Sequence, residues 1–264
     1  MNRMPRIKFY CRSFNKELYL LSRGLYEQAG YPCVRLTDQT ADGYFFKMLE
    51  DETCDIAINV DEDCFITDLD AVLALAKKAQ AEGWVNIGCS DAGEGVPRKG
   101  DPEVTNPFFN VFNLHDMRKA WNAYRLIPEL KRDRYKGIEP YYNFFHWMLQ
   151  AFPGKTLYLK SAHHTDGVTT RLDCCLHTWF ARQYNPGILT HLFEGNDLKE
   201  VNHRQRIDAV IDEAYARRGL QRPSFSIVQR IGFKMDELCR WTIKVPQRVS
   251  GWPEKIRQKM AHNR

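Results

Sequence analysis

Short apolar runs alternate with stretches whose apolar residues recur at helical spacing through the first third of the chain. The runs have the length of buried strands, and glycine or polar residues end the helical stretches. The predicted strands cover residues 6–11, 33–36, 54–60 and 84–89. The predicted helices begin after Ser13 (expected to cap the first one) and at residues 44 and 68. This alternation predicts an α/β fold around a mostly parallel central sheet with right-handed crossovers.

The second half of the chain is less regular. A loop rich in glycine, proline and charge is predicted at 90–107, a length typical of functional loops. Further strands are predicted at 108–114 and 156–161, and helices at 115–125, 139–151, 174–184 and 197–218. Neither a G-x-G-x-x-G after the first strand nor a G-x-x-x-x-G-K-[ST] is present, so the dinucleotide-binding fingerprint and the P-loop are excluded.

Size and charge divide the chain into two parts. A length of 264 residues fits one large domain, predicted at 1–218, followed by a basic extension at 219–264. From Arg217 to Arg264 there are twelve Lys and Arg against three Asp and Glu, a formal charge of +9 within a total of +5. The rest of the chain is therefore mildly acidic, and the extension is expected to bind anions.

The cysteines and the N-terminal residues indicate the cellular compartment in which the protein is expected. The sequence has no run of about eighteen apolar residues and no apolar signal segment at its start. The eight cysteines are scattered through apolar stretches, which is typical of free thiols in a reducing compartment. The adjacent Cys174 and Cys175 lack the spacing of structural zinc ligands, despite His177 nearby. We therefore expect a cytoplasmic protein with buried thiols on the predicted helix 174–184.

The segment INVDEDCF, residues 58–65, carries the sharpest chemical signal. A buried strand ends there in three acids, and alternation in an extended chain puts Asp61 and Asp63 on one side and Glu62 on the other. Two neighbouring carboxylates repel unless a cation or proton lies between them. Carboxylate oxygens suit Mg²⁺ or Mn²⁺, which would neutralise charge on a diphosphate leaving group. The alternative is an acidic turn exposed to solvent.

A strand ending in D-x-D after two strand–helix units resembles the GT-A glycosyltransferases, over roughly residues 6–197. The resemblance implies an acceptor side at NPFFNVFNL, residues 106–114, and an acidic residue at the start of the next helix, taken by Glu139. Asp173 is a second catalytic candidate, as is Asp166. A metal-ligating histidine is implied after the acceptor helices, and His191 fits that place.

The same resemblance implies contacts to the donor. Arg12 and Ser13, after the first strand, are expected near the nucleotide base, and Lys47 near the diphosphate. Lys47 is equally well explained as a solvated helix lysine. Asp91 and Glu94 are expected to shape the sugar pocket. His163 and His164 compete with His191 for the metal, and each of these histidines has a purely structural alternative.

The implied function is transfer of a sugar from a nucleoside-diphosphate sugar, preferably UDP-linked, with Mn²⁺ or Mg²⁺ as cofactor. The implied acceptor is a hydroxyl of a glycan or of a lipid-linked precursor of a polysaccharide or glycolipid. Trp241 and Trp252 lie among basic residues in the extension, a pattern that suits the anionic inner surface of a membrane. The alternative is a solvated tail, and Pro246 and Pro253 are expected to prevent one continuous amphipathic helix.

Two other classes of function remain as alternatives. A haloacid dehalogenase-like phosphatase also uses D-x-D after a strand, but places it on the first strand and follows it with Thr or Val, where this chain has Phe65. A non-enzyme would bind a nucleotide or act as a scaffold. No nucleic-acid-binding motif is visible, so nucleic acid is not an expected partner.

Overall fold

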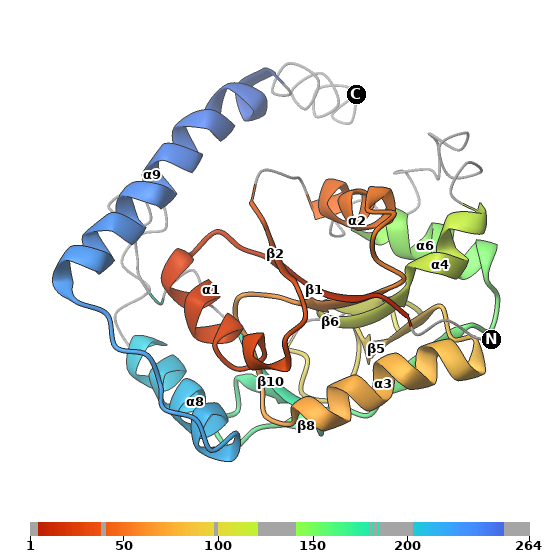
Figure 1. Cartoon of the computed structure of the whole chain (residues 1–264), viewed down its shortest axis with the longest axis horizontal. Helices are drawn as coiled ribbons and strands as arrows, with labels where there is room; N and C mark the ends of the chain where they lie inside the picture. The colour runs from red at the N-terminus through yellow and green to blue at the C-terminus, as the bar shows by residue number, and fades with distance from the viewer. Residues whose placement is uncertain are drawn as a thin grey trace, which may run out of the picture.

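The computed structural model describes residues 5–37, 41–97, 100–120, 141–179, 181, 184 and 203–250. A six-stranded sheet with the order β2-β1-β3-β6-β5-β7 forms its centre (Figure 1). The strands are β1 (Ile7–Arg12), β2 (Cys33–Leu36), β3 (Ile56–Val60), β5 (Asn86–Ser90), β6 (Thr105–Asn113) and β7 (Thr156–Leu159). The strands predicted from apolar runs are all present, with β6 beginning three residues early.

The sheet is mixed but mostly parallel, as predicted. β1 pairs in parallel with β2 and β3, and β5 with β7, whereas β6 is antiparallel to both β3 and β5. The carboxyl ends of β1, β3 and β5 therefore meet at one edge, where β6 begins. Ligands of such sheets bind at this edge.

Helices cover both faces of the sheet, and each layer buries its own apolar cluster. One face packs against α1 (Lys16–Arg23), α3 (Leu69–Glu82) and α8 (His203–Arg217). The other face packs against α2 (Ala41–Glu50), α4 (Leu114–Met117) and α6 (Tyr142–Ala151). Two short 3-10 turns complete the helical segments: η1 (Glu27–Ala29) and η2 (Arg118–Ala120). The result is a three-layered α/β/α architecture.

Helix ends follow local capping chemistry. α3 is capped by the Asp68 carboxylate, which accepts a hydrogen bond from the amide of Ala71, and is closed by Gly83 at φ 70°. The prediction of Ser13 as the cap of α1 is wrong. Asn15 caps it by accepting from the amide of Leu18, because the helix begins only at Lys16, after a bend at Phe14.

A second, four-stranded sheet has the order β4-β10-β9-β8. Its strands are β4 (Cys64–Ile66), β10 (Cys175–Thr178), β9 (Thr169–Arg171) and β8 (Ala162–His163). The predicted helix at 174–184 is therefore wrong where it covers β10. Cys175 pairs with Ile66, and this long-range pairing decides the conformation of a short apolar run that fits either structure.

The extension forms the long helix α9 (Ile227–Ser250), which lies along the outside of α1 (Figure 1). The helix runs through Pro246, which therefore does not interrupt it as expected, and Pro253 lies outside the described residues. Proline removes one helical hydrogen bond but can be accommodated as a local irregularity. The predicted boundary at residue 218 falls between α8 and α9. Within the described residues, none of the helices combines the length and apolarity needed to cross a membrane.

Candidate active site

The first acid of the D-x-D segment forms an ion pair across the sheet. Asp61 directly follows β3, and Arg12 is the last residue of the adjacent parallel strand β1. Arg12 Nη2 lies 2.7 Å from Asp61 Oδ2, and the guanidinium stands over the ring of Tyr44, 5.2 Å from its centroid. The sequence placed Arg12 near a nucleotide base. The structure brings it to the D-x-D carboxylate, and its contact with a nucleotide base stays a prediction.

Asp61 is only 6% exposed, and only one of its oxygens has a protein partner. Among the residues that the structure describes, Asp61 Oδ1 is buried without a hydrogen-bond partner, as are the Tyr44 hydroxyl and Asn59 Oδ1. Burial raises the pKa of Asp61, and repulsion by Asp63 adds to this effect, whereas Arg12 opposes it. Unsatisfied buried polar atoms are rare and costly. Their concentration near the end of β3 is typical of a site that is completed by a ligand.

Glu62 points away from Asp61, as predicted, but residues 62–63 form a turn between β3 and β4 and not the extended segment on which that prediction rested. Its carboxylate accepts hydrogen bonds from the amides of Phe14 at 2.9 Å and Asn15 at 2.6 Å. Glu62 thereby anchors the start of α1 to the D-x-D segment. Of the three acids, only Asp61 and Asp63 are left to act on a ligand.

His177 is the residue that the sequence reasoning missed at this site. It lies on β10, paired with Cys64 of β4, and its Nε2 is 3.5 Å from Asp63 Oδ1. The ring stacks on Phe108 at a centroid distance of 4.2 Å and an interplanar angle of 2°. Nδ1 is buried without a hydrogen-bond partner. The run 174–178 fits a helix as well as a strand, so no local signal places His177 here, and its position follows from the pairing of β10 with β4.

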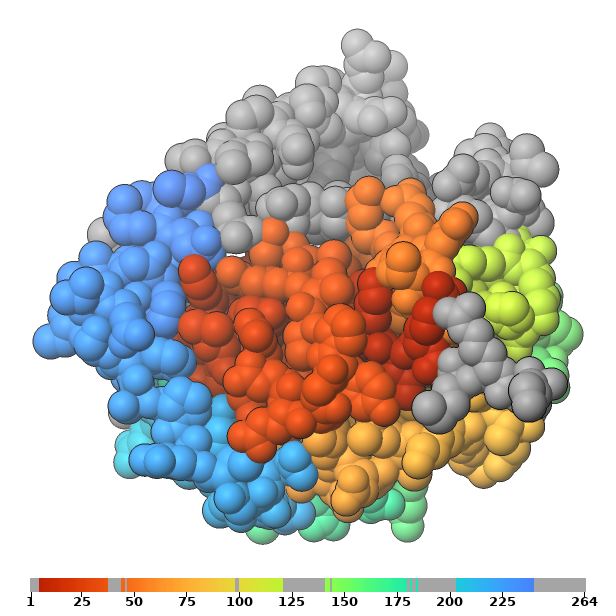
Figure 2. Space-filling model, viewed as in Figure 1, coloured from red at the N-terminus to blue at the C-terminus, as the bar shows by residue number. Residues whose placement is uncertain are grey.

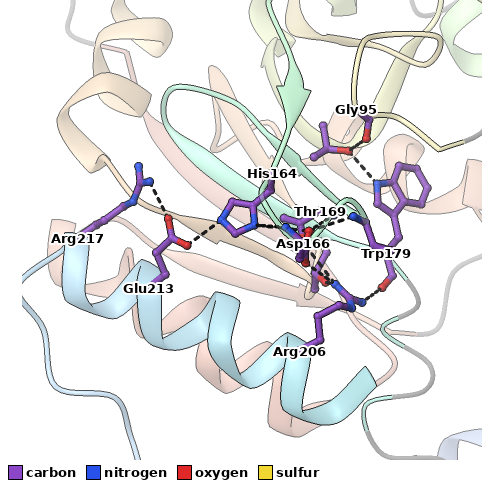
Figure 3. Close-up of polar contacts among 11 residues, drawn as sticks. Gly95, His164, Asp166, Thr169, Trp179, Arg206, Glu213 and Arg217 are labelled. Atoms are coloured by element: carbon purple, nitrogen blue, oxygen red, sulfur yellow. Dashed lines mark hydrogen bonds and ion pairs between the residues drawn. The ribbon is translucent and has the colours of Figure 1, made fainter. Parts of the chain in front are cut away.

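Arg206 of α8 holds the end of β10 in place (Figure 3). Its Nη1 donates to Thr178 Oγ1 at 2.6 Å and to Asp166 Oδ2 at 3.0 Å, and its Nη2 donates to the carbonyl of Trp179 at 2.6 Å. Thr178 and Trp179 directly follow His177. Arg206 therefore fixes the backbone that carries the histidine, and Asp166 belongs to this scaffold.

A second polar group lies at the carboxyl end of β5. Asp91 is fully buried, and its carboxylate accepts hydrogen bonds from Asn106 Nδ2 at 2.5 Å and from the Tyr142 hydroxyl. A side chain at Gly100 would meet this carboxylate, since an added Cβ would lie 2.2 Å from Asp91 Oδ2. Asp91 thus ties the loop after β5 to β6 and α6. Glu94, its predicted companion, is exposed.

The other predicted site residues have different contacts. Ser13 is buried and accepts from Arg35 Nε at 2.9 Å. Lys47 is exposed on α2, with its Nζ 3.0 Å from Glu50 Oε2. Asp173 is exposed in the turn between β9 and β10, at the opposite end of β10 from His177. Glu139 and His191 lie outside the described residues.

The rival histidines are also placed elsewhere. His163 is exposed, and His164 Nε2 lies 2.8 Å from Glu213 Oε2 on α8 (Figure 3). Cys174 and Cys175 are buried free thiols, and burial helps to raise the pKa of each, so the zinc alternative gains no support.

Within the part of the chain that the structure describes, no group of three or more His, Cys, Asp or Glu side chains is arranged to hold a metal ion. Asp61 and Asp63 nevertheless suit a hard cation through the unsatisfied Asp61 Oδ1. Mg²⁺ in particular is often held by one or two carboxylates, with water and substrate phosphates as the remaining ligands. These residues fit that mode of binding, in which the ligand set is completed by the substrate.

No model of a known protein family matches the chain, and no curated protein sequence matches it. Among solved structures, it is similar to a glycosyltransferase involved in the glycosylation of the major capsid of PBCV-1. The identity is 11% and the TM-score 0.42, over 59% of this chain and 82% of that one. It is also similar to the glycosyltransferase GlyE of Streptococcus pneumoniae TIGR4. Here the identity is 12% and the TM-score 0.37, over 60% of this chain and 45% of that one.

Proposed function

We propose that the chain is a metal-dependent glycosyltransferase that takes a nucleoside-diphosphate sugar as its donor. One observation carries the proposal: Asp61, at the carboxyl edge of the sheet, keeps one buried oxygen without a partner beside the second acid, Asp63. A buried carboxylate in this state gains most from a cation. The diphosphate of a nucleotide sugar would supply further ligands for that cation.

The donor proposed from the family resemblance is UDP-linked, with Mn²⁺ or Mg²⁺ held by Asp61 and Asp63. When bound, the metal would neutralise the charge that builds on the leaving diphosphate. Arg12 fixes one Asp61 oxygen, which leaves the other to face the ligand. We also propose His177 as a polar contact of this site, because its Nε2 lies 3.5 Å from Asp63 Oδ1. His191 is then no longer the only candidate histidine.

The acceptor side of the proposal rests on Glu139, which is the carboxylate proposed to receive the proton of the acceptor hydroxyl. Asp173 is less suited to this role, since it lies at the far end of β10 from His177. The proposed acceptor is a hydroxyl of a glycan or of a lipid-linked precursor. Loss of sugar transfer in Glu139→Gln, with donor binding retained, would support this assignment. Asp173→Asn is the matched comparison.

The phosphatase alternative needs a carboxylate nucleophile that phosphate can reach. One Asp61 oxygen is bound to Arg12, which disfavours that role. The inactive-module alternative predicts nucleotide binding without turnover.

One pair of assays separates the three functions. A panel of nucleotide sugars is incubated with the protein and Mn²⁺, and release of nucleoside diphosphate is compared with release of phosphate from p-nitrophenyl phosphate. The proposal predicts metal-dependent diphosphate release that is lost in Asp63→Asn. Phosphate release alone would indicate the phosphatase. Binding without either product, across donors and acceptors, would indicate an inactive module.

A further inference from the structure

Helix α9 has an inner face that is firmly attached to the body. Asp236 Oδ2 lies 3.2 Å from Arg35 Nη1, beside β1 and α1. Phe233 packs edge-on against Phe225 at a centroid distance of 5.1 Å, and Lys16 stands over its ring. These contacts fix which side of the helix points outward.

The outer face of α9 is apolar. Five large apolar side chains on it are between 50% and 78% exposed. They are Ile227, Val228, Ile231, Met235 and Leu238. Their spacing of three or four residues places them in one stripe, roughly opposite the side that carries Phe233 and Asp236. A continuous exposed apolar stripe on a helix is typical of an interaction surface.

The acidic and basic side chains of α9 also lie on different sides of the helix. Both of its acids turn toward the body: Asp236 pairs with Arg35, and Glu237 is shielded enough that burial raises its pKa to about 7. Lys234, next to the stripe, is exposed. From residue 238 to residue 250 the sequence contains basic residues and no acid. Lys234 therefore adds positive charge beside the apolar stripe, and neither acid of the helix lies on that side.

We propose that the outer face of α9 docks on an anionic lipid bilayer, with the helix lying in the plane of the interface. Apolar side chains would enter the boundary between headgroups and acyl chains, and the lysines and arginines would meet the lipid phosphates. A second copy of the chain fits this face less well, since a two-fold contact would bring two segments of charge +9 together. The proposal concerns attachment and does not depend on the reaction catalysed.

Vesicle flotation of the full chain tests the proposal. The vesicles contain phosphatidylcholine alone or mixed with phosphatidylglycerol. We expect the wild type to float with the mixed vesicles, and Ile231→Ser/Met235→Ser to bind at least about tenfold more weakly without any change in charge. Lys234→Gln is expected to weaken binding to mixed vesicles in a salt-dependent way, because it removes only the electrostatic attraction.

Ala74→Glu/Ala81→Glu serves as a folding and charge control. It adds two acids to exposed positions of α3, on a different side of the molecule from α9 (Figure 2), and is expected to bind like the wild type. Ile231→Glu/Met235→Glu adds the same charge to the stripe and is expected to abolish binding. The proposal is overturned if the wild type stays unbound on mixed vesicles. Equal binding of the wild type and the serine variant would also overturn it. A wild-type dimer in light scattering, with a monomer in the serine variant, would overturn it as well, because a second copy would then cover the stripe.

Discussion

Arg12 and Asp61 form an ion pair at the carboxyl edge of the sheet, with Arg12 Nη2 2.7 Å from Asp61 Oδ2. The pair joins the ends of two neighbouring parallel strands, β1 and β3. Only one Asp61 oxygen is used, and the other is buried without a partner. The ion pair thus orients the carboxylate and leaves part of its charge for a ligand.

Replacing Arg12 should lower the stability of the fold. We expect Arg12→Met to lower the free energy of unfolding by about 3 kcal/mol, because it leaves a buried carboxylate without its counter-charge. Asp61→Asn should be near neutral in stability, since the amide oxygen can still accept from Arg12 and the repulsion from Asp63 is gone. Urea unfolding of both variants measures the difference. Equal losses would show that Arg12 does not compensate the buried charge of Asp61.

The histidine assignment can be tested without disturbing the packing. We expect His177→Phe to keep the stack on Phe108 and to fold normally, but to bind a metal–nucleotide complex at least about tenfold more weakly, because both ring nitrogens are lost. His163→Ala is the control, since that side chain is exposed on β8. Isothermal titration with UDP and Mn²⁺ measures both. Wild-type affinity in His177→Phe, or a loss in His163→Ala, would place the histidine contact elsewhere.

Arg206 should matter to the site although it lies on α8, away from the D-x-D segment. Arg206→Met removes the hydrogen bonds to Asp166, Thr178 and the carbonyl of Trp179, so we expect a loss of about 3 kcal/mol in stability. We further expect weaker nucleotide binding at temperatures where the variant remains folded, with partial recovery in Arg206→Lys. Thermal unfolding and titration are the measurements. Unchanged binding in a folded Arg206→Met would show that β10 keeps its position without this support.

Glu237 should make the attachment of α9 depend on pH. Burial raises its pKa to about 7, although the Lys16 amide, Lys234 and Arg35 favour the charged form and Asp236 disfavours it. The folded state therefore holds the proton more tightly than the unfolded state, and stability falls as the pH rises from about 4.5 to 7. We expect Glu237→Gln to raise the Tm by about 2–4 °C at pH 8, the size of a change of roughly 1 kcal/mol, and by less at pH 5. An equal shift at both pH values would contradict the assignment.

The sequence was sufficient for the parts of the fold that local pattern determines. The buried strand Ile56–Val60 is apolar throughout, and α3 carries its own cap and its own terminating glycine, so both are visible in a short window. The alternation of strands and helices was then enough to predict the mostly parallel sheet. The antiparallel direction of β6 depends on its two neighbours and has no local signal.

The site was only partly predictable for the same reason. Asp61 and Asp63 follow a recognisable strand, so their place at the edge of the sheet could be predicted, but the turn at residues 62–63 has no signal in the alternation of side chains. His177 reaches Asp63 only because β10 pairs with β4, across more than a hundred residues of chain. No local pattern contains that pairing, and the run CCLHT fits a helix as well as a strand. Arg206 is a similar case, since its role depends on how α8 packs beside β10.

The most direct test of the central claim is the heat of UDP binding to the full chain, measured with Mn²⁺ and with a chelator. Asp61→Asn/Asp63→Asn is compared with Asp70→Asn, which removes an exposed carboxylate in the first turn of α3. The proposal predicts metal-dependent binding in the wild type and in Asp70→Asn, and its loss in the double variant. If the folded wild type binds neither UDP nor any other nucleoside diphosphate in the presence of Mn²⁺ or Mg²⁺, the D-x-D segment is not a donor site.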